Sequence, residues 1–188
     1  MDLMIDNNVR RPVPRATHLS VPTDVLSYAI AQCELGMVLV ARSGKGVCSI
    51  LLGDSMDELK ADLASRFPQS TIREDESSVH ADMSKVLRYI KKPTVGLHLT
   101  LDMRGTPFQR RVWEKLKAIS AGRTVSYTEL GHWISPLAHP RAIARACAAN
   151  PIALAVPCHR VVRSNGDMAG YRWDVERKRE LLRKEAMA

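Results

Sequence analysis

The fold of this chain is decided by residues 140–162, which read PRAIARACAANPIALAVPCHRVV. Small residues fill the first half, and their spacing predicts a compact helix over Arg141–Ala149. Asn150-Pro151 ends that helix, because the residue before a proline is driven out of the helical region. The second half is apolar and predicts a short strand over Ile152–Val156. The stretch is therefore a helix and a strand that lead directly into Pro157-Cys158-His159-Arg160.

A reactive pair of side chains stands at the end of this stretch. Cys158 is followed at once by His159, and a thiol becomes a strong nucleophile only when a base or cation helps it to lose its proton. Neighbouring side chains on a strand point to opposite faces, so a bridging water or a bend has to connect the two. The other cysteines show no CxxC spacing and no cluster with histidine, which predicts buried thiols and no metal site at Cys33, Cys48 and Cys147.

Helices are predicted on both sides of the quoted stretch. Amphipathic spacing and capping residues place them at Phe108–Ile119, Ser126–Ile134 and Val175–Ala186. Ser126 and Glu129 have the spacing of a capping box. The short helix that they open is followed, after a tight turn, by the alanine-rich helix, and this is the spacing of a helix-turn-helix. Any helical hairpin shares that spacing, so both readings stay open.

The composition changes near residue 104. Before it, alternating apolar residues and turn signals predict strands at Leu26–Cys33, Met37–Arg42, Val47–Leu52 and Val95–Leu101, and helices at Ser55–Phe67 and Ser77–Lys92. Residues 1–18 show no periodicity and predict a flexible tail. The sequence therefore predicts an α+β fold, with a small N-terminal α/β unit over 19–103 and a mainly helical domain over 104–188.

The charge of the chain is unevenly placed. Residues 1–100 carry 12 basic and 12 acidic residues, whereas residues 101–188 carry 16 basic and 8 acidic residues, so 16 − 8 accounts for the whole net charge of +8. A basic half indicates a polyanionic partner, although a solvated basic surface is the plain alternative. No apolar run approaches the ~20 residues that span a bilayer, and residues 1–15 lack the apolar core of a secretory signal. We expect a cytoplasmic protein, with no membrane partner.

The motif around the cysteine closely resembles the active-site signature of the O6-alkylguanine-DNA alkyltransferases. The resemblance rests on Pro157-Cys158-His159-Arg160-Val161, with Asn150-Pro151 upstream and Gly170-Tyr171-Arg172-Trp173 downstream. It is strong over residues 104–185 and fainter over 20–103. It implies a ribonuclease H-like N-terminal unit followed by a winged helix-turn-helix-like catalytic domain. The turn at residues 135–140 lacks the glycine usual in the family.

The resemblance implies a suicide reaction without a cofactor. Cys158 takes the alkyl group from O6-alkylguanine, and also from O4-alkylthymine, in double-stranded DNA, and a monomer carries out one turnover. His159 takes the thiol proton through a water, and Glu185 orients His159. Asn150 is implied as the hinge between the recognition helix and the active-site strand, and Tyr127 and Lys178 as aids to the leaving guanine.

The resemblance also implies a DNA-binding surface and a pocket for the flipped base. The DNA contacts are assigned to Arg141, which fills the gap left in the base stack, and to Arg145, Arg160 and Ala142. The base pocket is assigned to Val161, Tyr171 and Arg172. Plainer interpretations stay open, since Tyr127 is also typical of a core, Arg145 of a solvated surface, and Lys178 and Glu185 of an exposed helix face.

Two other functions compete with alkyl transfer. Alkyltransferase-like proteins keep this fold but bind damaged DNA without the cysteine, and the presence of Cys158 argues against that class. A hydrolytic Cys/His enzyme needs an oxyanion hole and has no reason to be basic. The sequence therefore favours alkyl transfer.

Overall fold

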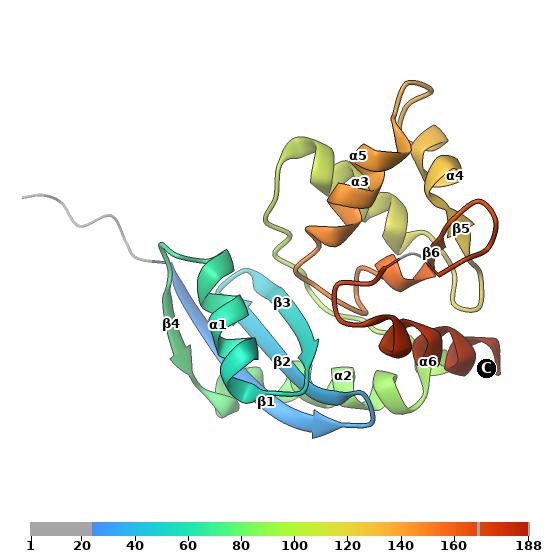
Figure 1. The fold of residues 1–188 in the computed structure, drawn as a ribbon. Coiled ribbons are helices and arrows are strands. Elements are labelled where there is room, and N and C mark those ends of the chain that lie inside the picture. Colours follow the sequence, from blue (N-terminus) through green and yellow to red (C-terminus); the bar gives the residue numbers. More distant parts are fainter. Residues whose placement is uncertain (1–23, 169, 188) are drawn as a thin grey trace, which may run out of the picture.

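The computed structural model describes residues 24–168 and 170–187, which form both strands and helices (Figure 1). In chain order they are β1 (Val25–Cys33), β2 (Gly36–Ser43), β3 (Gly46–Gly53), α1 (Met56–Arg66), β4 (Thr71–Glu74), α2 (Glu76–Lys91), η1 (Pro93–Val95), α3 (Pro107–Lys117), β5 (Val125–Ser126), α4 (Tyr127–His132), α5 (Pro140–Ala148), η2 (Cys158–Arg160), β6 (Val161–Val162) and α6 (Val175–Ala186). The tail predicted over residues 1–18 lies outside the described residues. The α+β class is confirmed.

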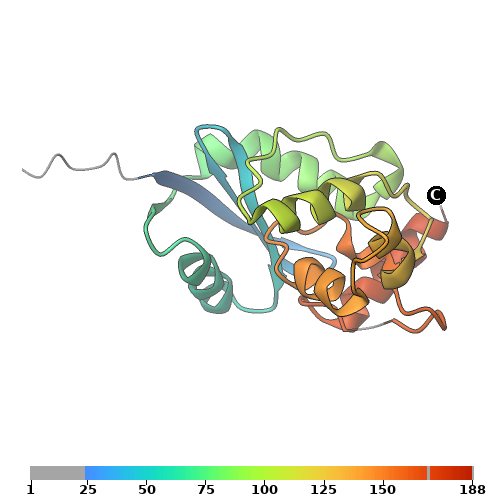
Figure 2. The same cartoon turned by 90° about the horizontal axis from the view of Figure 1, so that it is seen from above.

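A four-stranded sheet in the order β3-β2-β1-β4 forms the N-terminal part of the described chain. β1, β2 and β3 form antiparallel hairpins, and β4 runs parallel to β1. Helices α1 and α2 lie on opposite faces of the sheet (Figures 1 and 2). The three hairpin strands and both helices are confirmed, but β4 was not predicted, because its short edge position leaves it without a buried face. Met56, Leu59 and Leu63 are spaced for one face of α1, but only Leu59 and Leu63 are buried, whereas Met56 is 51% exposed.

One predicted strand forms only a single bridge at the open edge of β3. The backbone of Val47 donates to Thr100 O and accepts from the N–H of Asp102, both at 2.8 Å. The prediction of a strand over Val95–Leu101 is otherwise wrong, since the segment begins in the 3-10 helix η1. Gly96, at φ 69°, turns the chain in a conformation that a strand does not adopt.

The segment after Asn150 also forms only a single bridge to β3. Ile50 of β3 donates to Pro151 O and accepts from the N–H of Ala153, both at 2.9 Å. The strand predicted over Ile152–Val156 is wrong beyond this bridge, because Leu154 has a φ of 68° and turns the chain. The segment that carries the reactive cysteine is therefore fixed at its start to the N-terminal sheet.

The C-terminal part is built from helices α3 to α6 and a two-residue parallel pair of β5 and β6. The predicted capping box at Ser126 and Glu129 is present, and Asp174 caps the start of α6 with its side chain. Trp113 of α3 donates its indole N–H to Ala146 O of α5 at 2.8 Å, which fixes the packing of these two helices. Among the described residues, no helix has the length and apolar character needed to cross a membrane.

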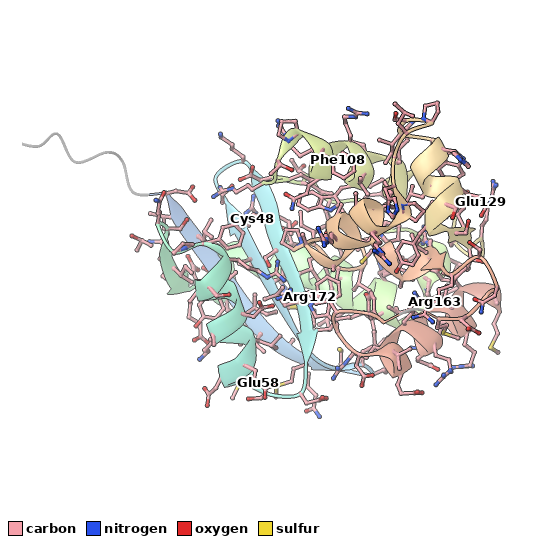
Figure 3. The ribbon with its side chains drawn as sticks, turned by 45° about the horizontal axis from the view of Figure 1, so that its top comes forward. Cys48, Glu58, Phe108, Glu129, Arg163 and Arg172 are labelled. Carbon is pink, nitrogen blue, oxygen red and sulfur yellow. The ribbon has the colours of Figure 1, made fainter. Side chains whose placement is uncertain are left out.

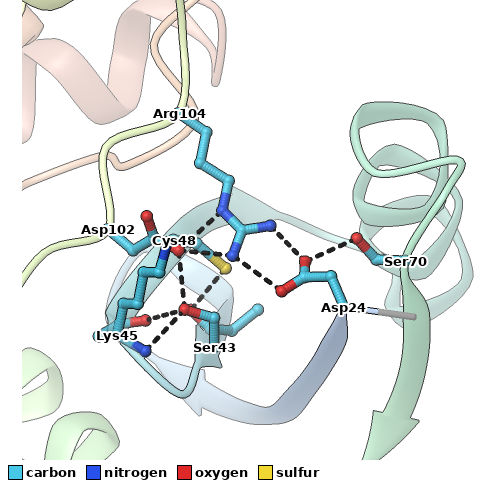
Figure 4. A network of polar contacts seen from close by, with 9 residues as sticks. Asp24, Ser43, Lys45, Cys48, Ser70, Asp102 and Arg104 are labelled. Carbon is cyan, nitrogen blue, oxygen red and sulfur yellow. Dashed lines mark hydrogen bonds and ion pairs between the residues drawn. The ribbon is translucent and has the colours of Figure 1, made fainter. Parts of the chain in front are cut away.

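Arg104 ties the connection between the two parts to the sheet (Figure 4). Its guanidinium bonds both Asp24 and Asp102, and Ser43 of the β2–β3 hairpin donates to Asp102 at 2.7 Å. The same guanidinium lies 5.7 Å from the centre of the Phe67 ring. Arg104 therefore anchors the segment before α3 to the N-terminal sheet.

Candidate active site

Cys158 opens the 3-10 helix η2 instead of ending a strand. Its backbone N–H donates to Val156 O at 2.8 Å, and its side chain is only 5% exposed. A 3-10 helix turns by about 120° per residue, so neighbouring side chains are not forced onto opposite faces as on a strand. Of the two links that the sequence left open between Cys158 and His159, a bridging water and a bend, the bend is present as this helical turn.

Asn150 joins the end of α5 to the cysteine. It is fully buried, and its Nδ2 lies 2.8 Å from Val156 O and 3.3 Å from the Sγ of Cys158. Its Oδ1 accepts from the N–H of Ile152 at 2.9 Å. One amide thus closes the loop between the helix and η2 and also donates to the sulfur.

His159 and Glu185 form a buried pair beside the thiol. The His159 Nε2 donates to the Glu185 Oε1 at 2.8 Å, and the two side chains are 0% exposed. The Nδ1 of His159 is buried and has no hydrogen-bond partner among the described groups. The pair therefore leaves one imidazole nitrogen ready to accept a proton.

The electrostatics of the pair favour a proton relay over a permanently ionised thiol. Burial raises the pKa of Cys158 to about 11, although the Asn150 hydrogen bond and Lys178 oppose the rise. Burial lowers the pKa of His159 below its usual value, against the pull of Glu185. At neutral pH the thiol thus keeps its proton and the imidazole is neutral, so a nucleophilic sulfur requires transfer of the proton during the reaction.

Glu185 stays ionised because the hydrogen bonds from its partners lower its pKa more than burial raises it. Burial acts to raise its pKa, but hydrogen bonds from His159 and Arg160 lower it to about 2. The carboxylate accepts from Arg160 Nε and Nη2, and from the backbone N–H of Gly122 at 3.3 Å. The interpretation of Glu185 as an exposed helix residue is wrong.

Lys178 and Tyr127 are both coupled electrostatically to the Cys158 thiol. Lys178 is 0% exposed and donates to Val161 O at 2.5 Å. Burial lowers the pKa of Lys178, and the two thiols Cys147 and Cys158 oppose this. Burial raises the pKa of Tyr127 to about 12, and the same two thiols contribute. Lys178 is therefore not a surface residue, and half-buried Tyr127 belongs to the cysteine's surroundings.

The predicted burial of the remaining cysteines is confirmed in two cases of three. Cys48 and Cys147 are buried, but Cys33 is half-buried near the end of β1. Among the described residues, no three His, Cys, Asp or Glu side chains gather where they could hold a metal ion.

The α5 surface carries three of the four residues predicted to contact DNA, Arg141, Ala142 and Arg145. Arg141 and Arg145 are exposed one turn apart, and Ala142 and Ala144 beside them are partly exposed. Arg160 is different, since it is 8% exposed and its guanidinium bonds the buried Glu185 and Ile119 O. The prediction that Arg160 contacts DNA is not supported by its position, because its hydrogen-bonding capacity is used inside the protein.

Two of the three residues predicted for the base pocket lie near the histidine. Val161 is fully buried directly after η2, and the ring of half-buried Tyr171 meets the His159 ring edge-on with centroids 6.5 Å apart. Arg172 points instead to the N-terminal part, where it pairs with Asp62 of α1 at 2.7 Å (Figure 3). Its contacts do not support a place in a base pocket.

Sequence reasoning missed one side chain in this cluster. Tyr89 of α2 donates its hydroxyl to the Glu185 Oε1 at 3.0 Å and is 3% exposed. No local signal marks it, since a tyrosine on the inner face of an amphipathic helix is an ordinary core residue.

The chain is similar to a known protein family and to several known proteins. Residues 107–187 match the family described as 6-O-methylguanine DNA methyltransferase, DNA binding domain. The chain is 45% identical over 159 residues to the bifunctional transcriptional activator/DNA repair enzyme Ada of Escherichia coli, which covers 85% of this chain and 45% of that protein. The chain thus spans about half the length of that relative.

Two further relatives match over most of both chains. A methylated-DNA–protein-cysteine methyltransferase of Candida albicans is 34% identical over 172 residues, covering 86% of this chain and 97% of that protein. The crystal structure of Mycobacterium tuberculosis OGT in complex with DNA is 30% identical with a TM-score of 0.68, and the match covers 86% of this chain and 93% of that one.

Proposed function

This chain belongs to the 6-O-methylguanine DNA methyltransferase family, and from that premise we propose that Cys158 accepts the alkyl group of O6-alkylguanine in double-stranded DNA. The observation that carries the proposal is the buried array in which Asn150 donates to the sulfur and Glu185 holds His159. A lesion-binding module has no need of this array.

The proposed step balances as a simple displacement. The Cys158 sulfur attacks the alkyl carbon, the carbon–oxygen bond breaks, and its electron pair stays on the guanine. The thiol proton passes through a water to the Nδ1 of His159, and the carboxylate of Glu185 stabilises the imidazolium. Tyr127 donates a proton to the leaving guanine, and the buried ammonium of Lys178 stabilises the negative charge that this leaves on the Tyr127 oxygen. A thioether on Cys158 and an undamaged guanine are the products.

A surface formed by α4 and α5 is proposed to hold the DNA as a helix-turn-helix. Arg141 and Arg145 supply positive charge there, and the small Ala142 and Ala144 let the helix backbone approach the groove closely. A base inside a duplex is out of reach of a buried thiol, so the nucleotide has to be flipped out.

We also propose O4-alkylthymine as a second substrate. We further propose that residues 19–103 and 104–188 form two domains.

The decisive experiment counts alkyl groups. With excess methylated duplex oligonucleotide, the protein should take up one methyl group per chain and then stop, because a thioether has no easy leaving path. Mass spectrometry of the digested protein should place the methyl group on the peptide that contains Cys158. Repeated turnover, or a label on Cys147 instead, would contradict the proposal.

Arg141→Ala should slow repair in duplex DNA about tenfold, since an inserted side chain offsets part of a flipping cost of a few kcal/mol. Reaction with free O6-methylguanine base should change by less than about twofold, because no flipping is needed. The measurement is the single-turnover rate with each substrate. Arg73→Ala, at an exposed arginine of β4, is the matched control and should leave both rates unchanged. Equal slowing with both substrates would place Arg141 outside the flipping step.

A further inference from the structure

The active site contains one side chain from the N-terminal part of the chain. Tyr89 lies on α2, outside residues 107–187 that match the family's DNA-binding domain. Its hydroxyl donates to the Glu185 Oε1 at 3.0 Å and accepts from the Arg160 Nη2 at 3.1 Å. The hydroxyl therefore closes a ring of three hydrogen-bonded groups, because Arg160 Nη2 also donates to Oε1 at 2.9 Å.

Three separate elements hold the Glu185 carboxylate. Tyr89 reaches it from α2, Arg160 from η2, and the backbone N–H of Gly122 from the loop before β5. Oε1 is the atom that also receives the His159 Nε2 at 2.8 Å. The direction of the carboxylate, and with it the angle of the imidazole, thus depends on all three contacts.

We propose that Tyr89 is a positioning residue for the alkyl-transfer reaction, whose hydroxyl aligns Glu185 so that His159 presents a neutral Nδ1 to the proton of Cys158. The proposal rests on the proposed function, since it assigns a role within the same relay. It gives the N-terminal part of the chain a direct share in the chemistry.

The physical reason lies in how the negative charge of Glu185 is shared. Tyr89 and Arg160 take up part of that charge, which limits the pull of the carboxylate on the imidazole proton. Without the hydroxyl, Oε1 loses a donor and the carboxylate turns more freely. The imidazolium is then favoured at rest, which blocks proton uptake from the thiol.

Other charged and titratable groups around His159 also act on its pKa. Arg160 and Lys178 both act to lower the pKa of His159, and Glu185 acts to raise it. Tyr171 meets the imidazole from the loop before α6, and burial keeps the pKa of its phenol well above 10. The Tyr89→Phe variant keeps all of these groups and removes only the hydroxyl's own bonds to Glu185 and Arg160, so a shift in the titration of His159 reports on the hydroxyl.

Tyr89→Phe should lower the single-turnover rate at pH 7 several-fold and move the acidic limb of the rate-against-pH profile upward by about half to one unit, as loss of one hydrogen bond to a charged group implies. The matched control is Tyr28→Phe, because Tyr28 is also buried in the N-terminal part and donates to a glutamate, Glu74, at 3.0 Å. The control variant should have the same single-turnover rate and the same acidic limb of the pH profile as the unsubstituted protein.

Two quantities, the amplitude of methyl uptake and its rate constant, distinguish a misfolded variant from one in which Glu185 is misaligned. Partial unfolding of Tyr89→Phe lowers the number of active sites, and hence the amplitude, without moving the limb. If the molecules of Tyr89→Phe that react show an unchanged acidic limb in the rate-against-pH profile, the proposal for Tyr89 is overturned. The proposed function is a separate matter, and it fails only if the unsubstituted protein leaves no methyl group on Cys158. An equal shift in Tyr28→Phe would also overturn the role of Tyr89.

Discussion

Cys158→Ser should abolish alkyl transfer, with a rate at least about a thousandfold below that of the unsubstituted protein, because a hydroxyl is a far poorer nucleophile than a thiol and is much harder to deprotonate. The surroundings of Cys158 make the loss larger. Burial already raises the pKa of the thiol to about 11, and the same burial opposes an alkoxide still more strongly. The measurement is methyl uptake from a methylated duplex under single-turnover conditions.

Binding of DNA should survive the same substitution. The exposed α5 residues are untouched, and Ser keeps an acceptor for the Asn150 amide that now donates to the sulfur at 3.3 Å. Cys33→Ser, at a half-buried cysteine near the end of β1, is the control and should keep full transfer. Transfer by Cys158→Ser at the normal rate would show that another residue accepts the alkyl group.

Glu185→Gln should slow transfer about tenfold to a hundredfold, since the imidazolium loses the carboxylate that stabilises it. The apparent pKa of the thiol in the rate profile should rise. His159→Ala should be slower than Glu185→Gln and faster than Cys158→Ser, because water replaces part of the proton acceptor. An unchanged rate and pH profile in Glu185→Gln would show that the carboxylate has no part in the relay.

The same substitution should lower the free energy of unfolding by about 3 kcal/mol, since it leaves the buried guanidinium of Arg160 without its carboxylate. The pKa of Glu185 is lowered from its ordinary 4.5 to about 2, so the ionised form stabilises the folded state. This contribution is complete above pH 4.5 and is lost as the pH falls toward 2. Denaturant unfolding should therefore show the gap between the two proteins closing in that range.

Glu180→Gln provides a matched control on the same helix. Glu180 pairs with Arg183 at the surface, where the guanidinium remains solvated after the change. Its loss should change the free energy of unfolding far less than the Glu185 substitution does, because an exposed ion pair contributes little. A comparable loss in both variants would mean that the buried position of Glu185 has no special effect.

The hairpin strands and the helices could be predicted because their signals are local. A capping box such as Ser126 and Glu129 spans four positions, and the apolar spacing of α3 and α6 repeats every turn. The segments that failed, Val95–Leu101 and Ile152–Val156, are apolar enough for strands. Their backbones turn at Gly96 and Leu154, and each keeps only one bridge to β3.

The sequence by itself determined the reactive pair, since Cys158 and His159 are neighbours, and it identified the basic half of the chain. Only the tertiary structure decided which charged side chains turn inward. Arg160 is of a residue type that often contacts DNA. Its partners in the structure, however, are Glu185, 25 positions away in the sequence, and Tyr89, 71 positions away. Burying a guanidinium is favourable only when such distant groups meet it, and no pattern of neighbouring residues records that meeting.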